Sequence, residues 1–118
     1  MEIKVLKNND NIYVVELLGA MDLYSSNQLK DLVMTMLGKK IECFVINLKE
    51  VNNVNSAGIG ALVFVSSTLK KLNCPLVIVA PEGPALQALE ITRLKGYFTI
   101  APSLKDAVAL AAAGFKKA

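Results

Sequence analysis

The chain has 118 residues, about one domain's worth, and 53% of them are apolar, which is enough to build one core. Charged residues make up only 19%, so disorder is not expected, and the net charge of +3 contains no dense basic run that would favour nucleic acid. Histidine is absent, which excludes Ser-His-Asp and Cys-His catalysis and zinc sites with histidine ligands.

The first third of the chain predicts a β-hairpin followed by a helix. Apolar strands at 3–6 and 12–18 flank the turn-forming cluster at 8–11, and Gly19 is expected to end the second strand. Apolar residues then recur at helical spacing from Leu29 to Leu37, with Ser25 or Ser26 as the cap. Gly38 is expected to end this helix.

The remaining elements alternate between strand and helix. We expect strands at 43–48, 76–80 and 98–100, a loop at 49–55, and helices from 56 to about 72, from 84 to about 94, and from 103 to 113, where Gly114 follows. This alternation predicts one α/β domain over residues 1–118, with a mixed central sheet of about five strands and about four helices.

Three features bear on the cellular compartment. The longest apolar stretch, from Ala57 to Val65, is far shorter than the roughly 20 residues that span a membrane. The N-terminus has no apolar region typical of a signal peptide. Cys43 and Cys74 lie in apolar surroundings, which favours two buried free thiols over a disulfide. We therefore expect a cytoplasmic protein without membrane insertion.

Evidence for catalysis is weak. Ser67 and Lys70 form an S-x-x-K pattern, in which a lysine one turn away can activate a serine, but the companion motifs of such enzymes are missing. Gly58 and Gly60 form a G-x-G that lacks the third glycine of a dinucleotide site. No carboxylate pair or metal-ligand cluster is apparent. We therefore expect no enzyme activity, no cofactor and no metal.

The helix that starts at Ser56 has two different faces. At 100° per residue, one side carries Ile59, Leu62, Val65, Ser66, Leu69 and Leu72, and we expect it to face the sheet. The opposite side carries Ser56, Gly60, Val63, Phe64, Ser67, Lys70 and Lys71. Two exposed apolar side chains beside small residues indicate a docking surface, although scattered surface apolars are also ordinary.

Ser56 has two compatible roles at the start of this helix. Asn55 and Ser56 both qualify as the N-cap. A hydroxyl in this position also lies where backbone N–H groups and the helix dipole stabilise added negative charge.

The chain resembles the anti-sigma factor antagonists, which are single-domain members of the STAS family. Besides the opening hairpin, the resemblance lies in Gly19-Ala20-Met21-Asp22, in the stretch from Val54 to Leu62, and in the Gly96-containing approach to the last strand. The stretch from Val54 to Leu62 is the most specific of these, because the family usually has Asp-Ser-Ser/Thr-Gly-hydrophobic-Gly there. In this chain Asn55 replaces the Asp and Ala57 replaces the Ser/Thr.

The resemblance implies a function in protein recognition. The chain would bind an anti-sigma factor that is also a serine kinase, and phosphorylation of Ser56 by that partner would dissociate the complex. ATP would be held by the partner. The residues expected at the contact are Asp22, Asn55, Ser56, Gly58, Gly60, Val63, Phe64 and Ser67.

Two alternatives stay open. The loss of the family's Asp at position 55 is compatible with a STAS subunit that works by binding alone, on a transporter ATPase or a signalling scaffold. A more distant alternative is a small serine hydrolase that uses Ser67 with Lys70, or Ser56.

Overall fold

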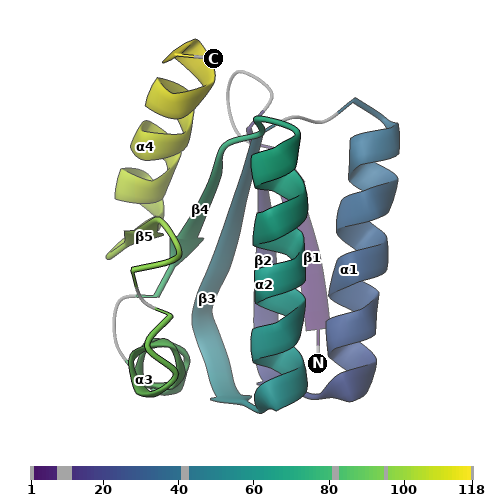
Figure 1. Ribbon diagram of the computed structural model, residues 1–118, viewed down its shortest axis with the longest axis vertical. Helices are drawn as coiled ribbons and strands as arrows, with labels where there is room; N and C mark the ends of the chain where they lie inside the picture. Colours follow the sequence, from purple (N-terminus) through teal and green to yellow (C-terminus); the bar gives the residue numbers. More distant parts are fainter. Residues whose placement is uncertain (1, 8–11, 41–42, 81–82, 95, 118) are drawn as a thin grey trace.

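The computed structural model describes residues 2–7, 12–40, 43–80, 83–94 and 96–117, with side chains as far as Ala113. Nine elements follow one another along the chain (Figure 1). They are β1 (Glu2–Lys7), β2 (Ile12–Met21), α1 (Leu23–Gly38), β3 (Cys43–Val54), α2 (Ser56–Lys71), β4 (Leu76–Val79), α3 (Pro84–Ile91), β5 (Ile100–Ala101) and α4 (Leu104–Lys117). The turn expected at 8–11 lies outside the described residues.

The five strands form one sheet in the order β1-β2-β3-β4-β5. β1 pairs antiparallel with β2, and all later neighbours are parallel. The expected mixed α/β architecture is therefore confirmed. Phe44, Val45 and Ile46 are all buried, because helices cover both faces of the sheet at β3.

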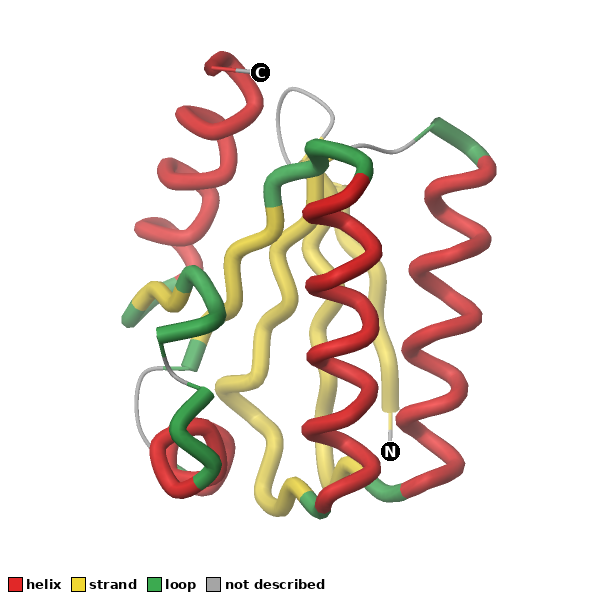
Figure 2. Tube along the Cα trace, in the orientation of Figure 1, coloured by secondary structure: helices red, strands yellow, loops and turns green. Residues whose placement is uncertain are grey.

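Each face of the sheet has its own apolar core. On one face, α1, α2 and α3 pack through Leu29, Leu62 and Leu89 against side chains such as Leu17 and Ile46. On the other face, α4 is the one helix among the described residues, and its Ala107 and Ala111 contact a group of strand residues. These are Ile12, Val14, Cys43, Val45, Val77, Val79 and Ala101. Figure 2 shows α1 and α2 running side by side in front of the strands.

Strands β2 and β3 both extend further toward their C-terminal ends than the sequence predicts. Gly19 does not end β2: it adopts a φ of 100° at a register shift, and the strand continues to Met21. The segment expected as a loop at 49–55 continues β3 as far as Val54, because the extension of β2 supplies it with a partner. Pairing between strands therefore outweighs the low strand propensity of asparagine.

Three later boundaries also differ from expectation. α3 ends at Ile91, and Thr92 turns its hydroxyl back to the carbonyl oxygen of Ala88. β5 lies at Ile100–Ala101, two residues beyond the predicted start. The last helix begins as expected, with Ser103 Oγ accepting from the Asp106 N–H, but it runs through Gly114 to Lys117.

The sheet-facing side of α2 is largely as predicted. Leu62, Val65, Ser66 and Leu69 are buried. Leu72 is 56% exposed, because it caps the C-terminus of the helix rather than continuing the buried stripe. Among the outward residues Val63 is half-buried and packs against the core, so its expected exposure is wrong, whereas Phe64 is 44% exposed.

The two faces of α2 predict opposite responses to truncation. Leu62→Ala should cost about 2–5 kcal/mol of unfolding free energy, because it removes buried methyl groups and leaves a cavity. Phe64→Ala should cost about 1 kcal/mol or less, since substitutions at exposed positions have small effects. Urea unfolding of both variants checks this. Equal losses for the two would contradict the assignment of faces.

Candidate functional site

Two helix N-termini lie side by side at one end of the molecule. α1 begins directly after β2 and α2 directly after β3, and these strands are parallel neighbours whose ends pair at Met21 and Val54. The Asn55 N–H donates to the Met21 carbonyl oxygen at 3.3 Å, which links the two connections. Both helices therefore start from the same edge of the sheet, at the bottom of Figure 1.

Asp22 caps α1. Its carboxylate accepts from the Ser25 N–H at 2.9 Å, while Ser25 Oγ accepts from the Asp22 N–H at 2.9 Å. The prediction that Ser25 or Ser26 is the cap is therefore wrong: Ser25 is the N3 partner in the capping box. The bonds from the Ser25 backbone and side chain lower the pKa of Asp22, so this exposed carboxylate is ionised at neutral pH.

Asn55 caps α2, and Ser56 is the first helical residue. The Asn55 side-chain oxygen accepts from the Gly58 N–H at 3.0 Å. Ser56 is exposed, and within the described part of the chain its hydroxyl has no hydrogen-bond partner. The cap and the exposed hydroxyl are thus supplied by two different residues.

The two glycines of the α2 motif have different surroundings. Gly58 is buried, and a Cβ atom there would lie 2.9 Å from Met21 Cβ and 3.0 Å from a methyl group of Val54. Gly58, expected among the residues at the contact, is therefore not exposed to a partner: this glycine lets α2 approach the end of β2. Gly60 is exposed, and a Cβ there would meet nothing within 4 Å.

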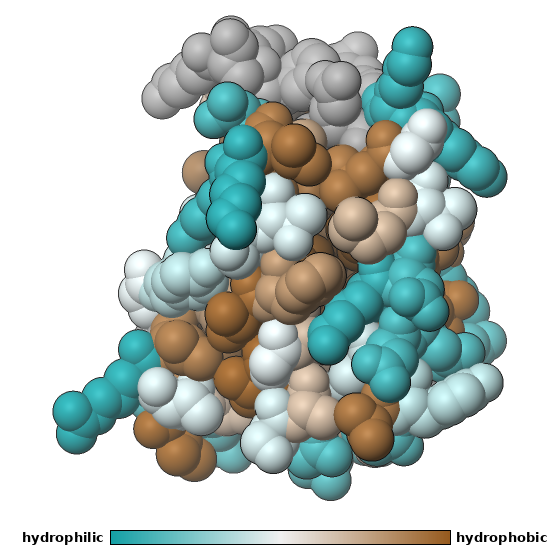
Figure 3. Space-filling view, turned by 45° about the vertical axis from the view of Figure 1, so that its right-hand side comes forward, coloured by the Kyte–Doolittle hydropathy of each residue, from teal (hydrophilic) through white to brown (hydrophobic). Residues whose placement is uncertain are grey.

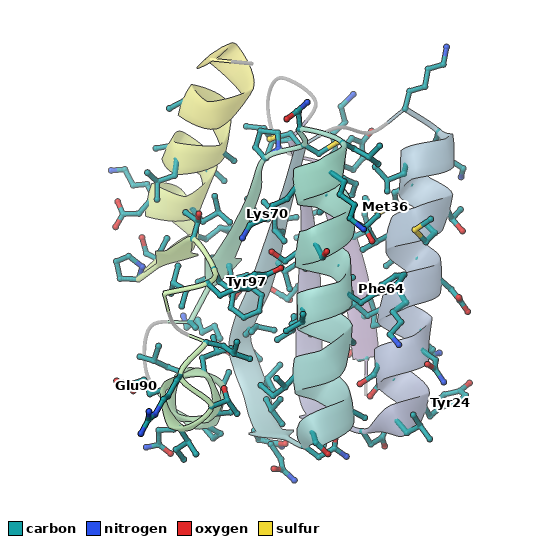
Figure 4. The ribbon with its side chains drawn as sticks, in the orientation of Figure 1. Tyr24, Met36, Phe64, Lys70, Glu90 and Tyr97 are labelled. Atoms are coloured by element: carbon teal, nitrogen blue, oxygen red, sulfur yellow. The ribbon has the colours of Figure 1, made fainter. Side chains whose placement is uncertain are left out.

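Phe64 extends the site along α2. It projects from α2 toward α1 (Figure 4), and the Lys30 amine lies 5.3 Å from its ring centre. Ser67 is half-buried one turn further on. On the side of the molecule shown in Figure 3, hydrophobic surface gathers in a band with hydrophilic atoms on both sides.

Sequence reasoning missed one apolar and one aromatic side chain at the start of α1. Leu23 is 65% exposed and Tyr24 is 73% exposed. They follow the cap Asp22, so they occupy the first turn of α1 beside the start of α2. Recognition of Asp22 as the N-cap would have identified them, because it moves the start of the helix several residues toward the N-terminus.

The geometry around Ser67 does not support the S-x-x-K interpretation. The Lys70 amine donates to the Tyr97 carbonyl oxygen at 3.0 Å and lies 3.7 Å from the centre of the Tyr97 ring (Figure 4). These contacts direct the Lys70 amine to Tyr97 rather than to the Ser67 hydroxyl. A neighbouring cavity of about 190 Å³ is lined by Ser66 and Lys70 but not by Ser67.

Cys43 and Cys74 are not joined by a disulfide. Cys43 is fully buried, and burial raises the pKa of its thiol to about 11, so it stays protonated. Cys74 is half-buried rather than buried as expected. Among the described residues, no three His, Cys, Asp or Glu side chains group as metal ligands, and no helix has the length and apolar character needed to cross a membrane.

Comparisons with known proteins agree with this architecture. The family model for the STAS domain matches residues 4–107. Among curated protein sequences no significant relative is found. All three solved structures described below are under 25% identical to this chain, so they bear on the fold alone.

An anti-sigma factor antagonist from Mycobacterium paratuberculosis superposes with a TM-score of 0.81 at 23% identity, covering 94% of this chain and 95% of that one. The Bacillus cell fate determinant SpoIIAA in its phosphorylated form gives 0.71 at 14% identity, covering 92% and 97%. A serine-to-glutamate variant of RsbS from Moorella thermoacetica gives 0.77 at 21% identity, covering 98% and 99%.

The two glycines predict opposite changes in stability. Gly58→Ala should lower the free energy of unfolding by about 1–3 kcal/mol, because the added methyl group meets Met21 and Val54. Gly60→Ala should raise it by about 0.5–1 kcal/mol, because alanine favours the helix and has open space. Thermal and urea unfolding measure both. A neutral Gly58→Ala would show that α2 does not need its close approach to β2.

Proposed function

The chain belongs to the STAS domain family, and we propose that it acts as an anti-sigma factor antagonist that is switched by phosphorylation at Ser56. In this proposal the unmodified protein binds an anti-sigma factor through the exposed surface around the starts of α1 and α2. The partner carries the serine kinase activity and holds the ATP. Phosphorylation of Ser56 then releases the partner.

One observation carries this proposal, which is the exposed hydroxyl of Ser56 at the N-terminus of α2. Asn55 already satisfies the cap, so Ser56 can be modified without the loss of a hydrogen bond that holds the helix. A phosphate in this position faces the positive end of the helix dipole and its first N–H groups. The fold should therefore tolerate the modification.

The surroundings of Ser56 suit a protein partner. Leu23 and Tyr24 from α1, and Gly60 and Phe64 from α2, are exposed on neighbouring helices. Apolar and aromatic side chains of this kind supply most of the binding energy at protein interfaces. Asp22, Asn55, Val63 and Ser67 complete the proposed contact, with Val63 contributing through its exposed part. Gly58 takes part only by fixing the position of Ser56.

The effect of phosphate on the partner follows from its charge. A phosphoserine carries about −1.5 to −2 charges at pH 7. The ionised carboxylate of Asp22 lies at the adjacent helix start, so the modification concentrates negative charge at this end of the site. A partner that fits the neutral serine closely must then desolvate or repel this charge.

Two structural relatives support the proposal through what they are named. One is named an anti-sigma factor antagonist, and another is described in its phosphorylated form. We further propose that the chain works by binding rather than catalysis, without a cofactor, and that it acts in the cytoplasm.

The proposed switch predicts that folding and binding separate at Ser56. Ser56→Asp should keep its melting temperature within a few degrees, yet bind the anti-sigma partner at least about ten-fold more weakly because of the added charge. Ser56→Ala should bind like the wild type and resist modification. Calorimetric titration with the partner, and mass spectrometry after incubation with partner and ATP, measure these outcomes.

The outcomes separate the proposal from its alternatives. Absence of phosphate on Ser56, under conditions where the kinase modifies a substrate with Asp-Ser, would favour a STAS subunit that works by binding alone. Asn55→Asp should raise the phosphorylation rate if the carboxylate contributes to the reaction. Labelling of the chain by a serine-reactive phosphonate would instead support a hydrolase.

The exposed ring of Phe64 predicts a binding defect without a folding defect. Phe64→Ala should weaken partner binding by more than about 1 kcal/mol if the ring is an anchor of the interface. Ile91→Ala is the matched control, because Ile91 is 81% exposed on α3, away from the proposed contact. If both variants bind the partner with the affinity of the wild type, Phe64 is not part of the contact.

A further inference from the structure

The outer edge of β1 has no partner strand in the described part of the chain. β1 stands at the end of the strand order and pairs only with β2. Five of its six residues are exposed, including Val5 at 42% and Leu6 at 51%. The backbone N–H and C=O groups along such an edge can pair with a strand from another chain.

A groove runs beside this edge. It has a volume of about 370 Å³ and lies between β1 and α1, lined by Ile3, Val5, Gln28, Asp31 and Leu32. Figure 3 is turned so that the side of the molecule carrying α1 comes forward. An apolar groove between an edge strand and a helix suits an added strand whose alternate side chains enter it. The Asp31 carboxylate favours a basic residue on that strand.

We propose that the added strand is β1 of a second copy of this chain, in an antiparallel pair that joins the two sheets. β1 itself carries the required chemistry. Its groove-facing side chains are Ile3, Val5 and Lys7, which are two apolar residues and one base. The Lys7 amine lies 5.9 Å from the Tyr13 ring centre, and Tyr13 packs against the core on the α1 face.

Symmetry and charge select one register. A two-fold axis perpendicular to the sheet places one residue of β1 opposite its own copy. Within β1, an axis at Lys4 pairs residues 2–6 of the two copies, and an axis at Val5 pairs residues 3–7; every other axis of this kind pairs fewer residues. An axis at Lys4 sets two ammonium groups opposite each other, which is destabilising. An axis at Val5 pairs Val5 with Val5 and sets Lys7 of the second copy opposite Ile3, beside Asp31.

This dimer is independent of the proposed switch. In the strand order, β2 separates the edge of β1 from β3, which leads into Ser56. The start of α2 therefore stays open when two copies pair through β1. Failure of the dimer would leave the Ser56 proposal standing, and failure of phosphorylation would leave the dimer standing.

Cysteine cross-linking tests the register. In a Cys74→Ser background, Val5→Cys should form a disulfide-linked dimer at least about ten-fold faster than Lys4→Cys, because a disulfide requires closely opposed Cβ atoms. Ile91→Cys, at a position 81% exposed on α3, measures random collision. A Lys4→Cys protein that links fastest, or a Val5→Cys protein that links no faster than Ile91→Cys, would overturn the proposal.

Solution mass tests the interface without new cysteines. The wild type should show twice its monomer mass of 12.7 kDa by light scattering, and Val5→Lys should show the monomer mass because it opposes two charges. Ile91→Lys should stay dimeric. Melting curves confirm that Val5→Lys is folded. A monomeric wild type, or a Val5→Lys protein that remains dimeric, would exclude this interface.

Discussion

The contact between Gly58 and the end of β2 determines the geometry of the whole site. Met21 and Val54 pair at the ends of two parallel strands, and both would crowd any side chain at position 58. Because glycine stands there, α2 can begin directly against β2, with only Asn55 between it and the end of β3. The starts of α1 and α2 therefore lie together, and Ser56 faces outward at their junction. A larger residue would force Met21, Val54 or the start of α2 to shift.

The protein separates the residues that hold the fold from those available for recognition. Leu62, Val65 and Leu69 hold α2 on the sheet, while the cap of α2 is held by Asn55. Ser56 and Phe64 contribute little to the packing of α2 on the sheet or to its N-terminal cap. Chemical change on the outer surface of the helix can therefore alter binding while the free energy of unfolding stays nearly constant. The proposed switch needs this separation, because domains of this size have only about 5–15 kcal/mol of stability.

Much of the fold could be predicted from local pattern. The continuous apolar runs at 43–48 and 76–79 are strands because helices cover both of their faces, and the position of Ser56 at a helix start follows from residue type. Features that depend on distant pairing could not be predicted. Val51 is buried in a strand because β2 continues past Gly19, and Gly58 is buried because of the same pairing. Likewise, the exposure of Leu23 and Tyr24 depends on which residue caps α1.

The helix on the opposite face of the sheet, α4, buries smaller side chains than α1 and α2. α4 is the one helix of the described residues on this face, and as far as Ala113 its fully buried side chains are Ala107 and Ala111, with Val108 and Ala112 partly buried beside them. A buried methyl group removes far less apolar surface from water than the leucines that anchor α1 and α2. Over the part of α4 whose side chains are described, burial against the sheet therefore contributes less free energy than the leucines of α1 and α2 contribute. Opening of α4 would uncover Cys43 and its apolar neighbours but not the core beneath α1, α2 and α3, because the two clusters lie on opposite faces of the sheet.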